Sequence, residues 1–465
     1  MASSFGGINT ALTSLYAQRR ALDVTGQNIA NANTEGYTRQ RAEMQSQVGS
    51  ISPAMYARTD GLGTGVAVSD VQRLRDEFLE NRGRAEHGKS SYLTTQTAAY
   101  NAIEDVFAEP GDTALAAQLH DMWGGWNDVA NNPQLTATRS TLIQQSSTVA
   151  DGLNTAHTNL AGQWSQNRMQ LSAYADEVNT AADSIAQLND SIVKAKATGM
   201  TVNELEDRRD LQVMRLSELT GATASARPNG AVDVFVGNST LVSEFTTRKL
   251  EVSGAARMED QGADPMTLRW ADTKTPVQAG GVMGGVQDTL STIIPAISDA
   301  LDSVAKNLAD KVNTLHGSGF SKDGSTGLDF FTSSNGGDIT AATIRLAITD
   351  PDQLAVASGP DSLDNSIADQ MADLGAALDG PDREYQGMIG QLGVAAQASA
   401  RRTEIQATVT EQVDASREAQ SGVNLDEEMT NLLTYQRGYE AASRVLTTID
   451  SMLDQLINRT GLVGR

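Results

Sequence analysis

Apolar residues recur every seven positions at both ends of this 465-residue chain, and this periodicity constrains the fold more than any other feature. Near the C-terminus the repeat is carried by Leu425, Leu432, Tyr435, Tyr439, Ala442, Leu446, Ile449, Leu453 and Leu456, and Met429 and Ile457 widen the stripe. A seven-residue apolar repeat is typical of helices that pair as a left-handed coiled coil. The C-terminal segment is therefore predicted to be a helix that needs a helical partner.

The N-terminal segment carries a weaker version of the same repeat. Its apolar positions are Ile8, Leu12, Leu15, Leu22 and Ile29, whereas Gln18 and Thr25 make the intermediate positions partly polar. Burying a large side chain contributes about 1.5 to 3 kcal/mol, but ordering each backbone residue costs about 1 to 2 kcal/mol. We therefore expect the terminal helices to pair with each other, to be marginal alone, and to gain further contacts from neighbouring copies of the chain. Periodicity alone also permits an ordinary coiled coil within a monomer.

Composition excludes several classes of function. The net charge of −23 argues against a nucleic-acid partner and against insertion into an anionic membrane. The absence of cysteine rules out disulfides and thiolate metal sites. Residues 1–10 lack the basic and apolar regions of a cleaved signal peptide, and no stretch approaches the length of about 18 apolar residues that a spanning helix needs.

The rest of the chain predicts a mainly α, elongated, multi-domain protein with a long-helix bundle and a β-rich insertion. Helical spacing covers about 74–108, 113–130, 135–192, 290–315, 362–378 and 382–421, and extended segments at 37–47 and 65–74 flank turns at Pro53 and Gly61–Gly65. Residues 222–284 change character, and Val232–Val236 alternate as a strand does. The predicted domains are 1–40 with 424–465, 41–221 with 285–423, and 222–284.

Three motifs resemble chemical sites. Gly83–Ser90 matches the phosphate-binding pattern G-x-x-x-x-G-K-[ST], which leaves a P-loop nucleotide-binding enzyme as an alternative, but helical spacing precedes it where a buried strand is required. We interpret it as a solvated helix face. Gly61–Gly65 is interpreted as a turn, and Asp323-Gly324 lacks the alternating acidic ligands of a calcium loop. The four histidines lie far apart, so no catalytic residue, cofactor or metal site is predicted.

Three separated segments resemble one family. Asn28-Ile-Ala-Asn-Ala-Asn-Thr-Glu-Gly-Tyr-Thr-Arg-Gln40 is similar to the N-terminal signature of bacterial flagellar rod, hook and hook-associated proteins. Residues 421–439 resemble the closing signature of that family, and residues 312–331 resemble its mid-chain pattern. Gln27 and Glu35 depart from the usual Asn and Pro, and the short segment 222–284 implies that an additional outer domain of longer relatives is missing.

The resemblance implies a structural role and no enzymatic one. It implies export in an unfolded state through the flagellar type III apparatus without a cleaved signal, with a chaperone on the C-terminal helix, and assembly into an extracellular ring of identical copies. The ring would join the hook protein to a filament-side hook-associated protein. The resemblance further implies that the path from the inner helix to the outer domains is set by Asn28, Asn31, Asn33, Gly36, Tyr37 and Arg39. Alternatives are another axial protein, namely a neighbouring junction protein or the hook subunit, and a secreted coiled-coil effector or adhesin.

Overall fold

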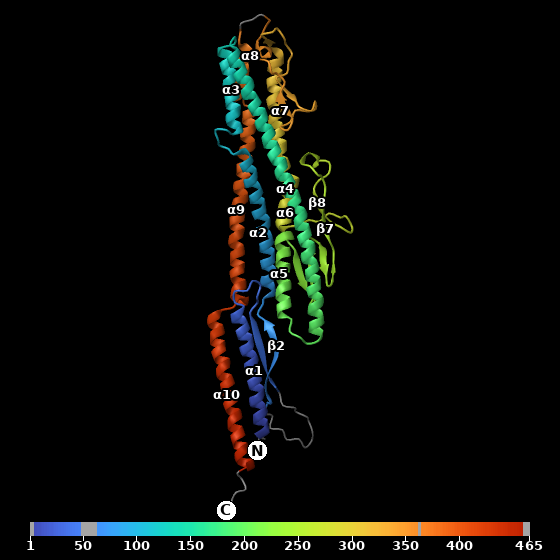
Figure 1. Cartoon of the computed structure of the whole chain (residues 1–465), viewed down its shortest axis with the longest axis vertical. Helices are drawn as coiled ribbons and strands as arrows, with labels where there is room; N and C mark the ends of the chain where they lie inside the picture. Colours follow the sequence, from blue (N-terminus) through green and yellow to red (C-terminus); the bar gives the residue numbers. More distant parts are fainter. Residues whose placement is uncertain (1–3, 48–62, 361–363, 459–465) are drawn as a thin grey trace, which may run out of the picture.

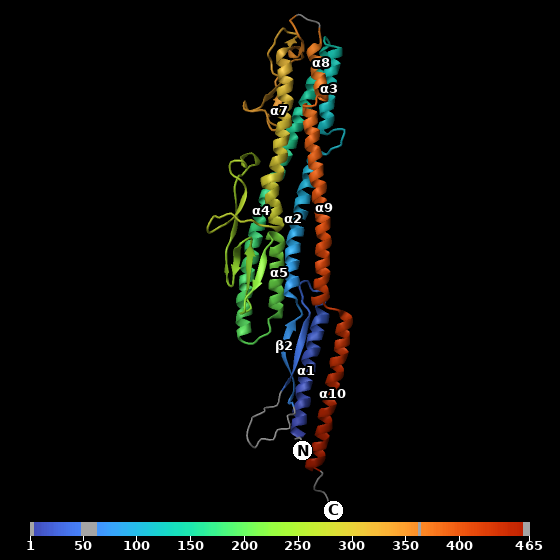
Figure 2. The same ribbon diagram turned by 180° about the vertical axis from the view of Figure 1, so that it is seen from behind.

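The computed structural model describes residues 4–47, 63–360 and 364–458, which form a long rod with most helices along its axis (Figure 1). Both ends of the chain lie at the same tip of the rod, and the view from behind shows the same arrangement (Figure 2). The predicted mainly α, elongated fold is confirmed. The expected turns at Pro53 and Gly61 lie outside the described residues.

Ten α-helices are present in the described part of the chain: α1 (Ser4–Ala30), α2 (Glu77–Phe107), α3 (Leu115–Asn131), α4 (Thr136–Ala197), α5 (Asn203–Thr220), α6 (Gly281–Asp288), α7 (Ile294–Ser318), α8 (Ser366–Asp373), α9 (Pro381–Ser421) and α10 (Leu425–Asn458). The strands are short: β1 (Gln40–Gln47), β2 (Gly65–Arg73), β3 (Thr223–Ala226), β4 (Val232–Val236), β5 (Ser239–Ser243), β6 (Thr246–Thr247), β7 (Leu250–Ser253), β8 (Thr267–Trp270), β9 (Phe320–Ser321), β10 (Phe331–Ser333), β11 (Ile344–Leu346) and β12 (Ala355–Ala357). None of the described helices has the length and apolar character needed to cross a lipid bilayer.

The tip that holds both ends of the chain is built from α1, α10 and the β1–β2 hairpin, which we name the terminal unit. The two strands are antiparallel, with an irregularity between Glu43 and Met44. The hairpin packs against one side of α1, and α10 packs against another side of α1. The buried apolar cluster of this unit is small and consists of Ala21, Val24, Ala42 and Val71.

The remaining long helices form the bundle, in which α2 lies along α9 and α4 extends over most of its length (Figures 1 and 2). α4 has 62 residues, in agreement with the predicted run. Its fully buried side chains follow the helical repeat and include Leu142, Val149, Leu153, Leu160, Trp164, Leu171, Val178, Ile185 and Ile192. Asp76 is the N-cap residue of α2, and its carboxylate accepts hydrogen bonds from the backbone N–H of Phe78 (2.9 Å) and Leu79 (3.1 Å).

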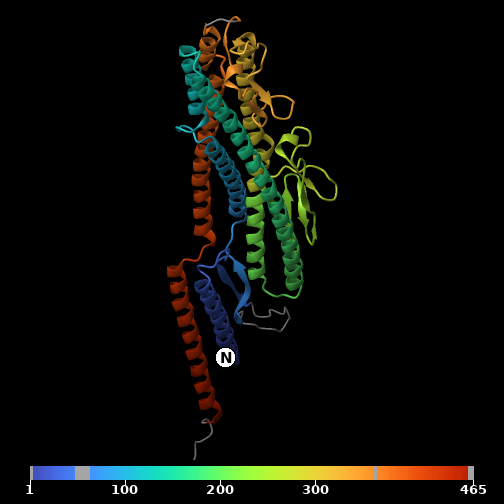
Figure 3. The ribbon, with the colours of Figure 1, turned by 45° about the horizontal axis from the view of Figure 1, so that its top comes forward.

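The β-rich segment lies against one side of α4 and α5 (Figures 1 and 3). Its four-stranded sheet has the order β3-β4-β5-β6, and β7 pairs with β8 separately. Val234, Leu268 and Trp270 are buried in the same apolar cluster as the helices. One continuous core therefore joins the β-rich segment to the bundle, while the predicted division of the chain into three domains stays a prediction.

Candidate functional site

The two terminal helices are brought side by side and antiparallel. Ile449 packs beside Gly7, and Gln18 beside Gly438. Asn28 at the end of α1 contacts Glu428 in the first turn of α10 (3.1 Å). The contact thus runs along the whole of α1, and Figure 1 shows both helices leading away from the bundle. The predicted pairing is present, and its supercoil stays a prediction.

The predicted seam residues differ in how much of their surface is buried. Most are half-buried: Ile8, Leu15, Leu22, Ile29, Leu432, Tyr435, Tyr439, Leu446, Ile449 and Leu453. Leu12, Leu425, Met429 and Leu456 are exposed, with 37% to 57% of their surface accessible. Among the described residues of α10, only Glu428 and Ala442 are buried. α1 alone therefore leaves much of the apolar surface of α10 uncovered.

The side-chain amide of Asn28 links the three parts of the terminal unit. It is 1% exposed, and its Nδ2 donates to the backbone oxygen of Gln40 (2.8 Å) and to Glu428 Oε2 (3.1 Å). Its Oδ1 accepts from the Tyr37 hydroxyl (2.8 Å) and from the backbone N–H of Gln40 (3.0 Å). All four hydrogen-bonding positions of the amide are used. Burial, followed by the charge of Asp207, raises the pKa of Tyr37 to about 12, so this hydroxyl stays a donor.

Arg39 fastens the same corner to α10. Its Nε donates to Glu428 Oε1 (2.8 Å) and its Nη1 to Glu427 Oε2 (2.7 Å). Its backbone N–H donates to the carbonyl of Ser421, the last residue of α9 (3.0 Å). Although burial opposes ionisation, the hydrogen bonds to Glu427 and Glu428 raise the pKa of Arg39. Asn28, Tyr37 and Arg39 therefore form one hydrogen-bonded group with Glu428, which we name the Asn28 node.

The other predicted residues of the signature have local roles or are exposed. Asn31 Nδ2 donates to the backbone oxygen of Gln27 (3.0 Å), and its Oδ1 accepts from the Thr34 hydroxyl (3.2 Å), which closes the end of α1. Gly36 has a φ of 77°, a left-handed conformation that favours glycine. Asn33 is exposed. The structure does not bring Asn31, Asn33 or Gly36 into the Asn28 node.

A second charged group joins the terminal unit to the bundle. Arg73, at the end of β2, contacts Glu206, Asp207 and Asp210 on α5, each at 2.8 Å. Arg75 pairs with Asp210 and with Glu80 of α2, and Arg417 of α9 pairs with Glu80 (3.0 Å). We name this group the joint.

The joint contains three arginines and four carboxylates. Although burial opposes ionisation, Arg75 and Arg73 hold the pKa of Asp210 below its ordinary value. Burial likewise opposes the ionisation of Glu80, whose pKa Arg75 and Arg417 nevertheless lower. Burial raises the pKa of Asp207, although Arg73 opposes this shift. The joint connects β2 with three helices of the bundle.

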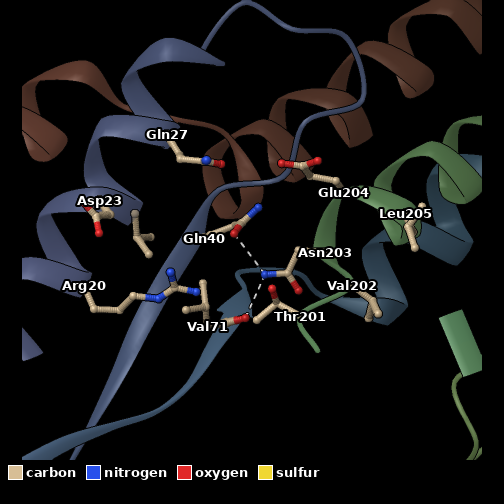
Figure 4. A pocket seen from close by; sticks show the side chains of 11 residues that line it. Arg20, Asp23, Gln27, Gln40, Val71, Thr201, Val202, Asn203, Glu204 and Leu205 are labelled. Carbon is tan, nitrogen blue, oxygen red and sulfur yellow. Dashed lines mark hydrogen bonds between the residues drawn. The ribbon is translucent and has the colours of Figure 1, made fainter. Parts of the chain in front are cut away.

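The connection between α4 and α5 docks on the terminal unit beside the joint. Figure 4 shows Asn203 at the start of α5 reaching toward the hairpin, and its Nδ2 donates to Gln40 Oε1 (3.0 Å) and to the backbone oxygen of Val71 (2.8 Å). Asn203 lines a groove between α1 and the start of α5, and Arg20 and Asp23 of α1 line its other side. Gln40 thus contacts both the Asn28 node and the bundle.

Several residues of this site were not predicted from the sequence. Glu428 occupies an alternating seam position of the repeat, between Leu425 and Leu432. A lone carboxylate in an apolar seam could have signalled a buried partner, since such a group requires one. Arg73, Asp207 and Asn203 carried no comparable signal, because they act through contacts between segments distant in the sequence.

The interpretation of Gly83–Ser90 as a solvated face was wrong. The segment lies within α2, as expected, but Gly83, Arg84 and Gly88 are buried. Gly83 packs beside the Arg417 side chain of α9, and Gly88 beside the backbone of Ser217 on α5. These glycines allow close helix contacts. The loop that a P-loop requires is absent here, because the described segment is helical throughout.

Comparisons with known proteins agree with this arrangement. A family model described as the helical domain of the flagellar hook-associated protein FlgK matches residues 100–331. Residues 8–38 match the flagella basal body rod protein, and residues 416–459 match the C-terminal region of the flagellar basal body rod FlgEFG proteins. The two rod-protein matches thus cover α1 and α10, the helices that the Asn28 node connects.

Whole-chain relatives are also found. The flagellar hook-associated protein 1 of Bacillus subtilis is 28% identical, with all of both chains covered, and that of Escherichia coli is 26% identical, with 97% of this chain and 99% of the relative covered. The solved flagellar hook junction protein FlgK from Burkholderia pseudomallei shares the fold, with a TM-score of 0.60 at 15% identity over 73% of this chain and 99% of that one.

Paired terminal helices that carry rod-protein signatures, with a helical bundle inserted between them, define the class of flagellar axial proteins. Within that class, the chain belongs to the flagellar hook-associated protein 1 family. It is a structural component of the bacterial flagellum, and the family is one of structural proteins and not of enzymes.

Proposed function

We propose that this chain is a self-assembling adaptor whose copies form a ring between the flagellar hook and the filament. The terminal units would form the inner layer of the ring, and the bundle and the β-rich segment would project outward. Its partners would be further copies of itself, the hook protein on one side and a filament-side hook-associated protein on the other. The proposed location is the flagellum outside the cell.

The observation that supports this role most is the uneven burial of apolar side chains. The bundle and the β-rich segment share one large core, whereas the terminal unit buries only four small apolar side chains in its own cluster. On α10, Met429, Leu433, Val445 and Met452 remain 48% to 51% exposed although α1 lies alongside. Exposed apolar surface of this extent is typical of a protein interface, and we infer that neighbouring copies cover it.

The same weakness of the terminal unit supports export in an unfolded state. Segments that bury little apolar surface are easily unfolded, because little free energy offsets the entropy of ordering them. We propose that the chain passes through the flagellar type III apparatus in this form, without a cleaved signal. A chaperone would cover the apolar face of α10 until export.

Substitution of exposed apolar residues of α10 tests the adaptor role. Met429→Asp with Val445→Asp places two charges outside the contact with α1, and we expect exported protein, hooks without filaments and loss of motility. The matched control is Thr430→Asp with Ser451→Asp, which adds the same charge to exposed polar positions of the same helix. The protein in the culture medium measures export, and electron microscopy of a complemented deletion strain measures assembly. Normal filaments on cells that carry the Met429 and Val445 variant would contradict the proposal.

A further inference from the structure

Two buried arginines beside the joint lack a hydrogen-bonded carboxylate. Arg84 on α2 is 8% exposed and Arg209 on α5 is 4% exposed. In the described part of the chain, Arg84 Nη1 donates to Asn81 Oδ1 (2.9 Å), and Arg209 Nη1 donates to Asn189 Oδ1 (3.2 Å) and to the carbonyl of Gly230 (2.7 Å). The Nε atoms of both are buried and meet no acceptor there. Arg209 Nε lies 3.8 Å from Asp210, which is too far for a hydrogen bond.

The nearby carboxylates are already engaged by other arginines. Asp210 is held by Arg73 and Arg75, and Glu80 by Arg75 and Arg417. Burial, which is the largest cause, lowers the pKa of both Arg84 and Arg209. An uncompensated buried guanidinium is costly unless a counter-charge reaches it. Arg84 and Arg209 therefore lie near negative charge but hold no carboxylate by a hydrogen bond in the described part of the chain, which leaves donors free for an anion.

Both arginines open onto one cavity. It has a volume of about 260 Å³, lies between α2, α5 and the strands β3 and β4, and is lined by six basic and four acidic side chains. The chain as a whole carries a net charge of −23, so this local excess of positive charge stands out. A water molecule occupies about 30 Å³, so the cavity has room for a small ion with several waters.

We propose that this cavity binds a small inorganic oxyanion of the phosphate or sulfate type between Arg84 and Arg209. A guanidinium presents a planar fork of N–H donors that matches the spacing of oxyanion oxygens, and charge-assisted hydrogen bonds of this kind are strong. The Nη2 groups, which have no hydrogen-bond partner in the described part of the chain, would supply the donors, since the Nε atoms are buried away from the cavity. The ion would connect α2 to α5 directly and would stiffen the bundle next to the joint.

Titration of the purified full-length chain with inorganic phosphate tests the proposal. We expect calorimetry to show binding, and we expect the Tm in sodium phosphate to exceed the Tm in sodium chloride at equal ionic strength. Arg84→Gln should weaken phosphate binding by about tenfold or more, since a charge-assisted pair is lost. The only hydrogen bond that this substitution removes within the described chain goes to Asn81, less than one turn away, so the variant should fold.

The matched controls are Arg82→Gln on α2 and Arg208→Gln on α5. Both arginines are exposed, lie outside the cavity lining and change the net charge by the same amount. They should bind phosphate as the unchanged chain does. Equal Tm values in the two salts, equal binding by the Arg84→Gln variant, or equal weakening by the two controls would each overturn the proposal, the last by showing a general charge effect. Far-UV circular dichroism confirms that each variant is folded.

Discussion

A single amide holds together three segments of the terminal unit. Asn28 satisfies two donors and two acceptors at once, from Tyr37, Gln40 and Glu428. A carboxylate at position 28 would lack the donors, and an aliphatic side chain would leave Glu428 Oε2 and the backbone N–H of Gln40 without the partners that Asn28 supplies. The position therefore demands an amide for physical reasons.

We predict that Asn28→Leu impairs junction assembly whereas Asn33→Leu does not. The first change leaves several buried polar groups without partners and should cost about 2 to 4 kcal/mol. Asn33 belongs to the same sequence signature but is exposed. The fraction of hooks that carry filaments, counted by electron microscopy with export verified, measures the effect. Equal fractions for the two variants would show that the Asn28 node contributes nothing.

His316 predicts a dependence of bundle stability on pH. The ring is fully buried, its Nδ1 lies 2.6 Å from the carbonyl of Leu328, and its Nε2 accepts from the backbone N–H of Ala355 (3.0 Å). These two contacts require the neutral imidazole with its proton on Nδ1, and burial lowers its pKa from the ordinary value of 6.5. As the pH falls below that value, the unfolded chain takes up the proton first. The stabilisation is therefore complete above pH 6.5 and is lost as the pH falls through the folded-state pKa.

Thermal unfolding at about pH 7.5 and about pH 5 measures this effect, because each pKa unit of difference corresponds to about 1.4 kcal/mol. The Tm of the unchanged chain should fall between these conditions by more than that of His316→Gln, whose amide has no proton to gain. Parallel decreases in the two proteins would remove His316 from the explanation.

At the residue scale, the residues of the Asn28 node on the N-terminal side were predicted from the sequence, but their partner on α10, Glu428, was not. Asn28, Tyr37 and Arg39 were selected through a family resemblance, and the structure joins them. Asn33 came from the same resemblance and is exposed. Glu428 was missed because the heptad pattern was followed for its apolar residues, and a buried carboxylate becomes favourable only when its partners are known.

At the scale of elements, the rod depends on how the terminal unit meets the bundle. Figure 3 shows α9 and α10 as two separate helices displaced sideways at their short connection, so the helices do not transmit a rigid direction across it. Side-chain contacts instead orient the terminal unit relative to the bundle. Arg73 pairs with three carboxylates of α5, and Asn203 donates hydrogen bonds to Gln40 and to the backbone oxygen of Val71. We infer that these contacts set the angle between the terminal unit and the bundle.

We predict that Arg73→Gln destabilises the joint by about 1 to 3 kcal/mol, because Asp207 loses its cation whereas Arg75 still pairs with Asp210 and Lys196 with Glu206. Arg208→Gln is the matched control, since Arg208 is an exposed arginine on the acidic helix α5. Hydrogen exchange of α5 measures the loss of stability. Its amides should exchange faster in the Arg73→Gln variant, and their exchange rates should not change in the control. Unchanged protection in both would show that the joint adds no rigidity.

Elements were predictable where the pattern is local. The seven-residue and four-residue spacing of buried residues identified α4 almost to its ends, and the alternation of Val232–Val236 identified β4. The burial of Gly83 and Gly88 was not predictable, because it depends on where α9 and α5 pass over α2. Contacts between distant segments determine that path, and the pattern of a single segment does not contain them.

At the scale of the whole molecule, stability is distributed unevenly along the rod. One apolar core runs through the bundle and the β-rich segment, while the cluster of the terminal unit contains two alanines and two valines. Valine burial contributes about 1.5 kcal/mol or somewhat more and alanine less, so this cluster by itself offsets little of the cost of ordering α1, α10 and the hairpin. The proposed role requires neighbouring copies to complete the terminal unit.

Hydrogen exchange followed by mass spectrometry, applied to the dilute monomer and to isolated hook-filament junctions, tests this requirement most directly. We predict that the amides of α1 and α10 exchange rapidly in the monomer and are strongly protected in the junction, while those of α4 are protected in both. Strong protection of α1 and α10 in the monomer, equal to that in the junction, would contradict the account.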